Sequence, residues 1–372
     1  MSAQKNDNRM SWIRNAEKLS ASPDGGYYCE YEFVSECRIT GLLDYENGKL
    51  ICGLFTLEED RNGLYHYLLR IQYPKFEGGY NEKADKKGYY FKDGIIGELL
   101  SLFSLYFQCR FYIVAIYQGE LTNRSIKIKM EQEFSYKKIP KGIHPKIFSE
   151  DNKNFAVGLS DFLDSVRKLD SQKHQRFILA CHHYARSLKE VGRDSEMVFI
   201  RLVSAIEILS GAYKLRKKDN PLNGEKFSVM FNDTSLTKEQ AKQLKEILKV
   251  NGQGKIQIGK SKQKFINFVK AHSTGCLKGG NWKAKHVRIT RQNLPDVLTT
   301  IYDARSRYLH SGEPMYLSQF MHGAGKWDTD PSLGMMIDNR KFPSAHKLPY
   351  TYWFENLVRH CLLNYLKSNL PK

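Results

Sequence analysis

The sequence predicts an α+β protein, with a β-rich N-terminal domain followed by an α-helical domain, and three observations predict it. Residues 27–138 consist of short apolar segments separated by Gly, Asn and Asp, a pattern typical of strands and turns. Beyond about residue 153, apolar residues recur with the 3.6-residue period of helices. A hydrophobic fraction of 41% over 372 residues is enough for a folded core and excludes general disorder.

The N-terminal half begins with a polar arm, residues 1–24, in which a short helix is expected over Trp12–Leu19. The β-rich domain is expected over residues 25–140, with Pro140, Gly142 and Pro145 marking a linker after it. Its one helix is GIIGELLSLFSLYF (94–107), and its strand segments are CEYEFVSECRIT (29–40), KLICGLFTL (49–57), LYHYLLRIQYP (64–74), CRFYIVAIYQ (109–118) and SIKIKMEQEF (125–134).

The helical domain is expected over residues 153–370, with a basic insertion over residues 214–292 that contains a helix at Lys238–Val250. Asp194 or Ser195 is a suitable N-cap for the second main helix. The third has Pro295 near its first turn and Gly312 just past its end, the usual start and stop residues. The main helices are predicted at His174–Glu190, Ser195–Tyr213, Leu294–His310 and Tyr350–Ser368.

The positive charge is concentrated in the second half of the chain. The net charge is +18, and residues 1–150 contribute only +1 of it. No acidic residue lies between Glu246 and Asp296, a stretch with eleven Lys and Arg residues. Such a block predicts a polyanionic partner, nucleic acid before a membrane surface, and the alternative is a solvated loop. The candidate RNA-binding residues are Lys255, Lys260, Lys262, Lys264, Lys283, Lys285 and Arg288.

The cysteines and the N-terminus indicate a cytoplasmic protein. Seven cysteines, an odd number without CxxC spacing, favour buried thiols in a reducing compartment over disulfides or zinc. The alternative is a metal site that joins Cys29, Cys37, Cys52 and Cys109. The N-terminus lacks the apolar region of a secretory signal, and no apolar run has the length of a membrane helix. We therefore expect a cytoplasmic location, no membrane partner, no cofactor and no metal.

One motif indicates chemistry, in a chain without a P-loop, GxGxxG, GxSxG or HExxH sequence. The third main helix ends in YDARSRYLHSG (302–312), which places Arg305 five residues before His310. This resembles the Rx4–6H motif of the HEPN superfamily, and YLHSG after YDAR resembles its ApeA-like branch. The helix FIRLVSAIEILSGA (199–212), with Glu207, is similar to an earlier core helix of these domains. The resemblance covers about residues 155–370.

The resemblance implies a compact helical domain that dimerises with two motifs face to face. It also implies a metal-independent endoribonuclease, and many members of the family are toxins or effectors of antiviral defence. Arg305 and His310 match the catalytic pair, and Ser306 stands where the family often has Asn, Asp or His. We expect cleavage of single-stranded RNA or a tRNA loop, with a phage-derived trigger sensed by the N-terminal domain.

Physical chemistry favours the same two residues. Metal-free RNA cleavage needs a base for the 2′-hydroxyl, an acid for the leaving oxygen and a cation on the phosphorane; His and Arg supply these. On an ideal helix Arg305 and His310 lie about 140° apart, so one chain does not bring them to one face, and a two-fold dimer supplies the second group. Ser306 lies only about 40° from His310, where its hydroxyl orients the imidazole.

Structural interpretations of these residues remain open. His310 at a helix end also caps carbonyls, and Arg305 also pairs with Asp303 or Glu207. Tyr302 and Tyr308 either stack on bases or belong to the core, and Arg307 is a supporting cation. The histidines of the first main helix, His174, His182 and His183, are interpreted as ordinary core or surface residues. The competing function is a helical dimer that binds nucleic acid without catalysis.

Overall fold

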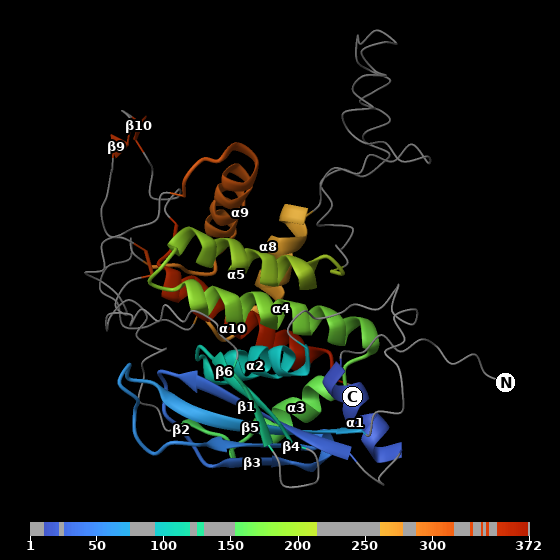
Figure 1. Cartoon of the computed structure of the whole chain (residues 1–372). Helices are drawn as coiled ribbons and strands as arrows, with labels where there is room; N and C mark the ends of the chain where they lie inside the picture. Colours follow the sequence, from blue (N-terminus) through green and yellow to red (C-terminus); the bar gives the residue numbers. More distant parts are fainter. Residues whose placement is uncertain are drawn as a thin grey trace, which may run out of the picture.

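The structure is a computed structural model, and it is mixed α and β, as the sequence predicts. An antiparallel sheet occupies one end of the molecule and the helices are stacked on it (Figure 1). The residues that the structure describes are 11–21, 26–74, 94–119, 125–129, 153–213, 261–277, 288–315, 328–329, 336–337, 340–341 and 348–370.

The main sheet has six strands in the order β3-β4-β5-β1-β6-β7, and every neighbouring pair is antiparallel. The central strand β1 pairs Tyr31 with Leu69 of β5 on one side and with Ile116 of β6 on the other. The segments with alternating apolar residues became its strands, and β3 is an additional one. Their bounds are β1 (Gly26–Ser35), β3 (Leu42–Tyr45), β4 (Leu50–Leu54), β5 (Tyr65–Pro74), β6 (Tyr112–Gly119) and β7 (Ser125–Lys129).

Short elements flank this sheet and the helices. β2 (Ile39–Thr40) pairs in parallel with β8 (Lys153–Asn154), which brings the start of the helical segment back to the sheet. β9 (Met336–Ile337) pairs with β10 (Arg340–Lys341), and a short 3-10 helix spans Glu46–Gly48.

Two N-terminal helices complete the sheet side of the molecule. α2 (Gly94–Phe107) has the predicted bounds and lies between the sheet and α4 (Figure 1). All but three of its residues are buried, which is typical of a helix packed on every side. α1 (Ser11–Ala21) packs against β5 and α2. Its Trp12 is fully buried, and the Trp12 backbone N–H donates a hydrogen bond to the Glu98 carboxylate on α2.

The other helices form a packed group on the far side of α2. The four predicted helices are present, and Asp194 caps α5 by accepting a hydrogen bond from the Met197 backbone N–H. Two further helices were not predicted: α3, and α8, which packs against α5, α9 and α10 with Phe265 and Phe268 buried. The bounds are α3 (Leu159–Arg167), α4 (Ser171–Glu190), α5 (Ser195–Ser210), α8 (Ser261–His272), α9 (Leu294–Ser311) and α10 (Thr351–Ser368).

One apolar core runs from the sheet through α2 into the helices without a break. A buried polar network crosses the same boundary: the Glu355 carboxylate on α10 accepts hydrogen bonds from the Tyr184 hydroxyl on α4 and from the Gln108 amide after α2. The predicted linker at residues 140–145 and the predicted helix at Lys238–Val250 lie outside the described residues. None of the helices in the described part of the chain meets the length and hydropathy that crossing a bilayer requires.

Candidate active site

The end of α9 projects beyond the packed helices. Its buried residues are Leu294, Val297, Leu298, Ile301 and Ala304, and from residue 305 to residue 314 no residue is buried. The helix stops at Gly312, whose positive φ of 69° is the left-handed conformation that glycine adopts easily, and its N–H bonds the Tyr308 carbonyl. The chain becomes buried again at Met315, whose N–H is donated to Glu196 on α5. The predicted motif therefore lies on a protrusion that is anchored at both ends.

Arg305 is held by a carboxylate on the neighbouring helix. Its Nη2 lies 2.8 Å from Oε2 of Glu207 on α5, and the two side chains are 20% and 24% exposed. The Tyr302 hydroxyl also hydrogen-bonds Glu207; burial raises the pKa of this phenol, and the carboxylate's charge and hydrogen bond raise it further. Of the two partners that the sequence left open for Arg305, the structure selects Glu207.

The guanidinium of Arg305 keeps donor capacity after this pairing. Its Nε is buried and has no hydrogen-bond partner among the described residues. Because a guanidinium has five N–H donors in one plane, one carboxylate does not occupy all of them. The ion pair with Glu207 fixes the position of the side chain, and the fifth of the side chain that is exposed is the part that an anion can contact.

His310 lies on the last turn of α9 and is exposed. Among the described residues none hydrogen-bonds its imidazole, so the interpretation as a carbonyl cap finds no support there. α9 stays helical through Ser311, so His310 lies about 7.5 Å further along the axis than Arg305 and about 140° around it. One chain does not bring the two side chains together at this end of the helix.

The residues around the pair divide between surface and core. Ser306 is half-buried, one turn before His310. Arg307 is exposed and forms an ion pair of 3.0 Å with Glu313, so it is already neutralised in part. Tyr308 is half-buried and packs against the apolar core, which agrees with the core interpretation of this residue.

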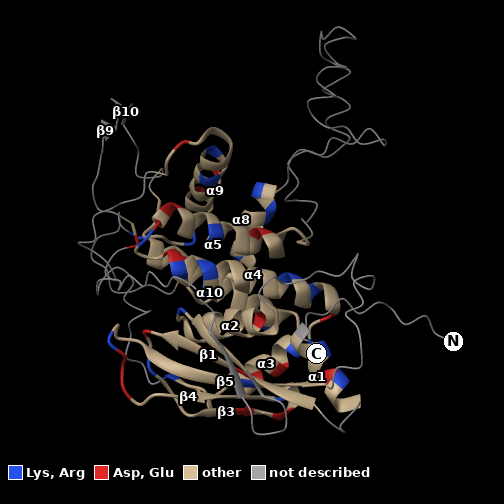
Figure 2. Ribbon diagram, in the orientation of Figure 1, with Lys and Arg blue, Asp and Glu red and all other residues tan. Residues whose placement is uncertain are grey.

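Of the predicted RNA-binding residues, three are described, and two of these have protein partners. Lys262 on α8 forms an ion pair of 2.7 Å with Asp303 on α9, and Lys264 donates a hydrogen bond to the carbonyl of Gly211. Arg288 is half-buried near Asp328, whose pKa burial raises above its usual value. Figure 2 shows Lys and Arg on α8 and α9. Lys255, Lys260, Lys283 and Lys285 lie outside the described residues.

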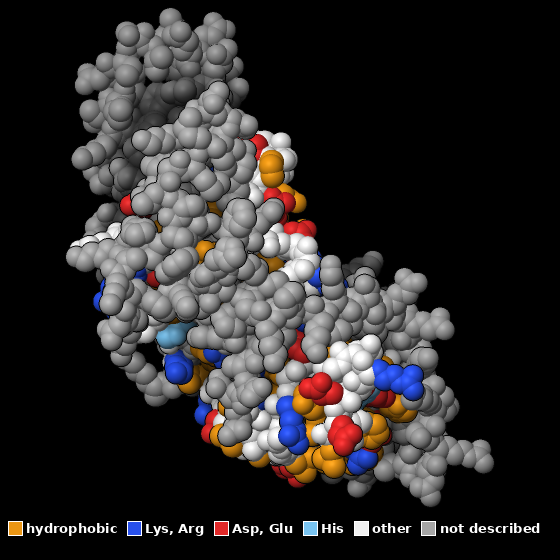
Figure 3. All heavy atoms as spheres, turned by 90° about the vertical axis from the view of Figure 1, so that its left-hand side faces the viewer, with side chains coloured by type: hydrophobic (Ala, Val, Ile, Leu, Met, Phe, Trp, Pro, Cys, Tyr) orange, Lys and Arg blue, Asp and Glu red, His pale blue; other side chains and the backbone are white. Residues whose placement is uncertain are grey.

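A second basic cluster, His183 with Arg186 and Arg201, lies where α4 meets α5, and the sequence analysis did not predict it. Burial lowers the pKa of His183, and the charges of Arg201 and Arg186 lower it further. Nδ1 of His183 and Nε of Arg201 are buried without a hydrogen-bond partner among the described residues. On the face drawn in Figure 3, a His side chain lies near Lys and Arg side chains. The spacing of His183 and Arg186, one turn apart on α4, was the available signal.

Metal ligands do not gather in the described part of the chain: no group of three or more His, Cys, Asp or Glu side chains there is arranged to hold a metal ion. All seven cysteines are free thiols, six of them buried. The chain matches no protein-family model, no curated protein and no solved structure.

Proposed function

We propose that this protein is a metal-independent endoribonuclease of the HEPN type, cytoplasmic, and an effector of antiphage defence. The observation that supports it is the protrusion at the end of α9, where an exposed histidine follows an arginine that a carboxylate holds in place. An imidazole in water moves protons near neutral pH, and a fixed guanidinium with free donors stabilises a phosphorane. The substrate class is single-stranded RNA or a tRNA loop.

In this mechanism His310 takes the proton from the ribose 2′-hydroxyl, which attacks the adjacent phosphorus. Arg305 binds the phosphorane oxygens, and Glu207 acts as a positioning residue that keeps the guanidinium oriented. The 5′-oxygen leaves with a proton and the product ends in a 2′,3′-cyclic phosphate. Because one chain does not bring both residues to one face and its motif supplies only one histidine, we propose that two motifs related by a two-fold axis act on one phosphate and that the second copy supplies the acid.

The two parts of the fold have different roles in this proposal. We assign the HEPN-like activity to the helices of residues 153–370 and the recognition of a phage-derived trigger to the β-rich residues 25–140. The cations Lys262 and Lys264, and those at the α4–α5 contact, lie on the helical side and support binding of a polyanion there. The alternative is a helical dimer that binds nucleic acid without cleaving it, and the same cations favour it.

Incubation with total RNA in EDTA separates the two functions. The endoribonuclease yields fragments with 2′,3′-cyclic phosphate and 5′-hydroxyl ends, and it leaves DNA of the same sequence intact because DNA lacks the attacking hydroxyl. The non-catalytic dimer shifts the RNA in a gel without shortening it. Fragments that end in 5′-phosphates and appear only with a metal ion would contradict the proposal.

The variant His310→Ala tests the catalytic role. We expect cleavage to fall by about 100-fold to 10,000-fold, the usual contribution of a general acid or base. Lys367→Ala is the matched control, because Lys367 is also the basic residue in the last turn of an 18-residue helix, α10, and is exposed. Both substitutions truncate an exposed side chain in the last turn of an 18-residue helix, so their unfolding free energies should change alike. Equal cleavage by the two variants would show that His310 has no catalytic role.

The dimer has its own test on the same protrusion. Leu309 is 47% exposed beside His310, as expected of a residue that a second copy covers. We expect Leu309→Ser to shift the protein toward monomer in sedimentation and to lower cleavage in parallel. Leu57→Ser, at a leucine that is 79% exposed on the sheet side, is the control and should change neither. A monomeric wild-type protein that still cleaves RNA would contradict the shared site.

A further inference from the structure

Two thiols and one ammonium meet where the sheet joins the helices. Nζ of Lys153 lies 3.3 Å from Sγ of Cys109 and 3.7 Å from Sγ of Cys37, and the two thiols hydrogen-bond each other. Cys37 follows β1, Cys109 follows α2, and Lys153 begins β8, so three separate segments supply the cluster. Neither cysteine belongs to the site at α9.

The electrostatics of this cluster differ between its two thiols. The hydrogen bond from Cys109 and the charge of Lys153 together hold the pKa of Cys37 below its ordinary value, whereas burial raises the pKa of Cys109. Burial disfavours the charged form of Lys153, and the two sulfurs outweigh this and raise the pKa of its ammonium. Cys37 is therefore the thiol of the two that ionises more readily, and thiolates, not thiols, are the nucleophiles.

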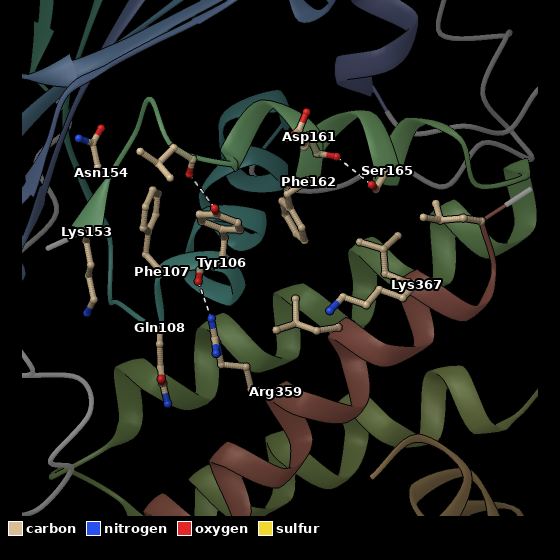
Figure 4. A pocket seen from close by; sticks show the side chains of 14 residues that line it. Tyr106, Phe107, Gln108, Lys153, Asn154, Asp161, Phe162, Ser165, Arg359 and Lys367 are labelled. Atoms are coloured by element: carbon tan, nitrogen blue, oxygen red, sulfur yellow. Dashed lines mark hydrogen bonds between the residues drawn. The ribbon is translucent and has the colours of Figure 1, made fainter. Parts of the chain in front are cut away.

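The cluster adjoins a cavity. Figure 4 shows Lys153 and Gln108, the neighbour of Cys109, on the wall of a cavity of about 740 Å³, which is also lined by the end of α2, by α3 and by α10. Arg359 lies on the same wall, where its guanidinium donates hydrogen bonds to the carbonyls of Leu105 and Tyr106. Lys153 is thus the residue that the cavity and the cluster share, and neither cysteine lines the cavity itself.

We propose that Cys37 and Cys109 form a peroxide-sensitive dithiol that closes to an intramolecular disulfide, with Lys153 as the residue that positions and stabilises the attacking thiolate. The Cys37 sulfur attacks a hydroperoxide: the S–O bond forms, the O–O bond breaks, and the sulfur loses two electrons to the peroxide. The released oxygen takes a proton and leaves as water or an alcohol. The Cys109 sulfur then attacks Cys37: the S–S bond forms, and the S–O bond breaks as hydroxide leaves with the thiol proton as water.

The disulfide would cross-link two segments on the boundary between sheet and helices. Gln108, next to Cys109, donates hydrogen bonds to Glu355 and to Asn356 on α10, at 2.6 Å and 3.0 Å. Oxidation thus ties the loop after β1 to a segment that already contacts α10, and it removes the sulfur partners that hold the Lys153 ammonium.

Differential alkylation of the full-length protein tests this proposal. Reduced protein, freed of reductant, is exposed to hydrogen peroxide, alkylated, digested and analysed by mass spectrometry. We expect a cross-linked Cys37–Cys109 peptide pair two hydrogens lighter than its reduced parts, and dithiothreitol should restore both thiols. Cys52, Cys181 and Cys361 are internal controls: all are buried, with pKa values that burial raises, and should remain unmodified.

Three outcomes would overturn the proposal: Cys37 and Cys109 stay as unreactive as Cys52, they oxidise separately to sulfinic acids, or all the buried thiols react together, as they would after global unfolding. Lys153→Met should slow disulfide formation by about tenfold, the effect of raising the attacking thiol's pKa by about one unit, and Lys153→Arg should restore the rate. Equal rates in the wild type and Lys153→Met would remove Lys153 from the mechanism while the mass analysis still tests the dithiol.

Discussion

Two arginine–glutamate pairs lie in different parts of this molecule, and their surroundings give them different roles. Arg110 and Glu36, at the sheet, are 0% and 4% exposed with Nε and Oε1 2.6 Å apart; Arg305 and Glu207, at α9, are 20% and 24% exposed at 2.8 Å. The buried charges depend on each other because water reaches neither. At α9 solvent screens the pair, and the arginine keeps donors for a ligand. The same chemistry thus stabilises the fold in one place and prepares a site in the other.

Truncating each arginine in turn tests whether the two pairs have different roles. Arg110→Ala removes the cation that lies 2.6 Å from the buried Glu36 carboxylate, and we expect the free energy of unfolding to fall by about 3–5 kcal/mol. Arg305→Ala should cost only about 0–1 kcal/mol and should lower RNA cleavage at least 100-fold. Urea unfolding and cleavage assays measure the two effects.

A double substitution controls for the loss of packing. Arg110→Met with Glu36→Leu removes both charges and keeps apolar volume, so it should recover much of the stability that Arg110→Ala loses. If Arg305→Ala destabilised the protein as strongly as Arg110→Ala, the assignment of a ligand role to the pair at α9 would be wrong.

The pH dependence of stability tests the effect of burial at a third group, His272, which is partly buried. The ring of His272 on α8 packs between Phe268 and Tyr365, and burial lowers its pKa below 6.5. The folded state therefore binds fewer protons than the unfolded state. The stabilisation is present above pH 6.5 and is lost as the pH falls below it, with a slope of at most about 1.4 kcal/mol per pH unit.

Urea unfolding at pH 7.5 and at pH 5.5 measures this loss. His272→Gln, which does not titrate, should show a smaller decrease than the wild type between the two pH values. A decrease of the same size in both proteins would assign the acid sensitivity to other groups, among them His183, whose pKa is also lowered.

The smallest expected effect concerns an ion pair with still more exposure. Lys262 and Asp303 are 39% and 40% exposed, so Lys262 must leave Asp303 to contact a phosphate. We expect Asp303→Asn to strengthen RNA binding by about two- to fivefold, the release of a surface pair worth less than about 1 kcal/mol. Binding titrations at several salt concentrations measure this.

Asp296→Asn is the charge-matched control for that variant. Asp296 lies on the first turn of the same helix and is exposed, and it forms no ion pair with a described lysine. A general effect of net charge would strengthen binding equally in both variants, and the proposed role of Lys262 would then be lost.

The elements that the sequence predicted correctly are those whose signal lies within the element itself. GIIGELLSLFSLYF predicts the bounds of α2 because it is predominantly apolar over its whole length, and Pro295 and Gly312 bracket α9 because they act within one turn. α8 was not predicted because its segment contains Lys262, Lys264 and Lys270 and was assigned to the basic insertion. Its Phe265 and Phe268 are nevertheless buried in the core.

The candidate site was predicted in its residues but not in its contacts. The motif indicated Arg305 and His310 but not the partner of the arginine. Asp303 lies two residues from Arg305 on the same helix and so faces another way, whereas the contact with Glu207 depends on how α5 packs against α9. The Lys153 cluster lacked a signal for the same reason: its three residues come from three segments that only the fold brings together.

The core that passes without a break from the sheet through α2 to α4 limits how this chain can be recombined. Proline and glycine at residues 140–145 suggest a place to exchange one half for another. An exchange there would separate α2 from the face of α4 that it covers and would break the hydrogen bonds from Gln108 to α10. The unit that evolution or a protein engineer transfers intact therefore includes both sides of this boundary. A new specificity in the sheet has to be acquired by substitution within it, not by replacement of it.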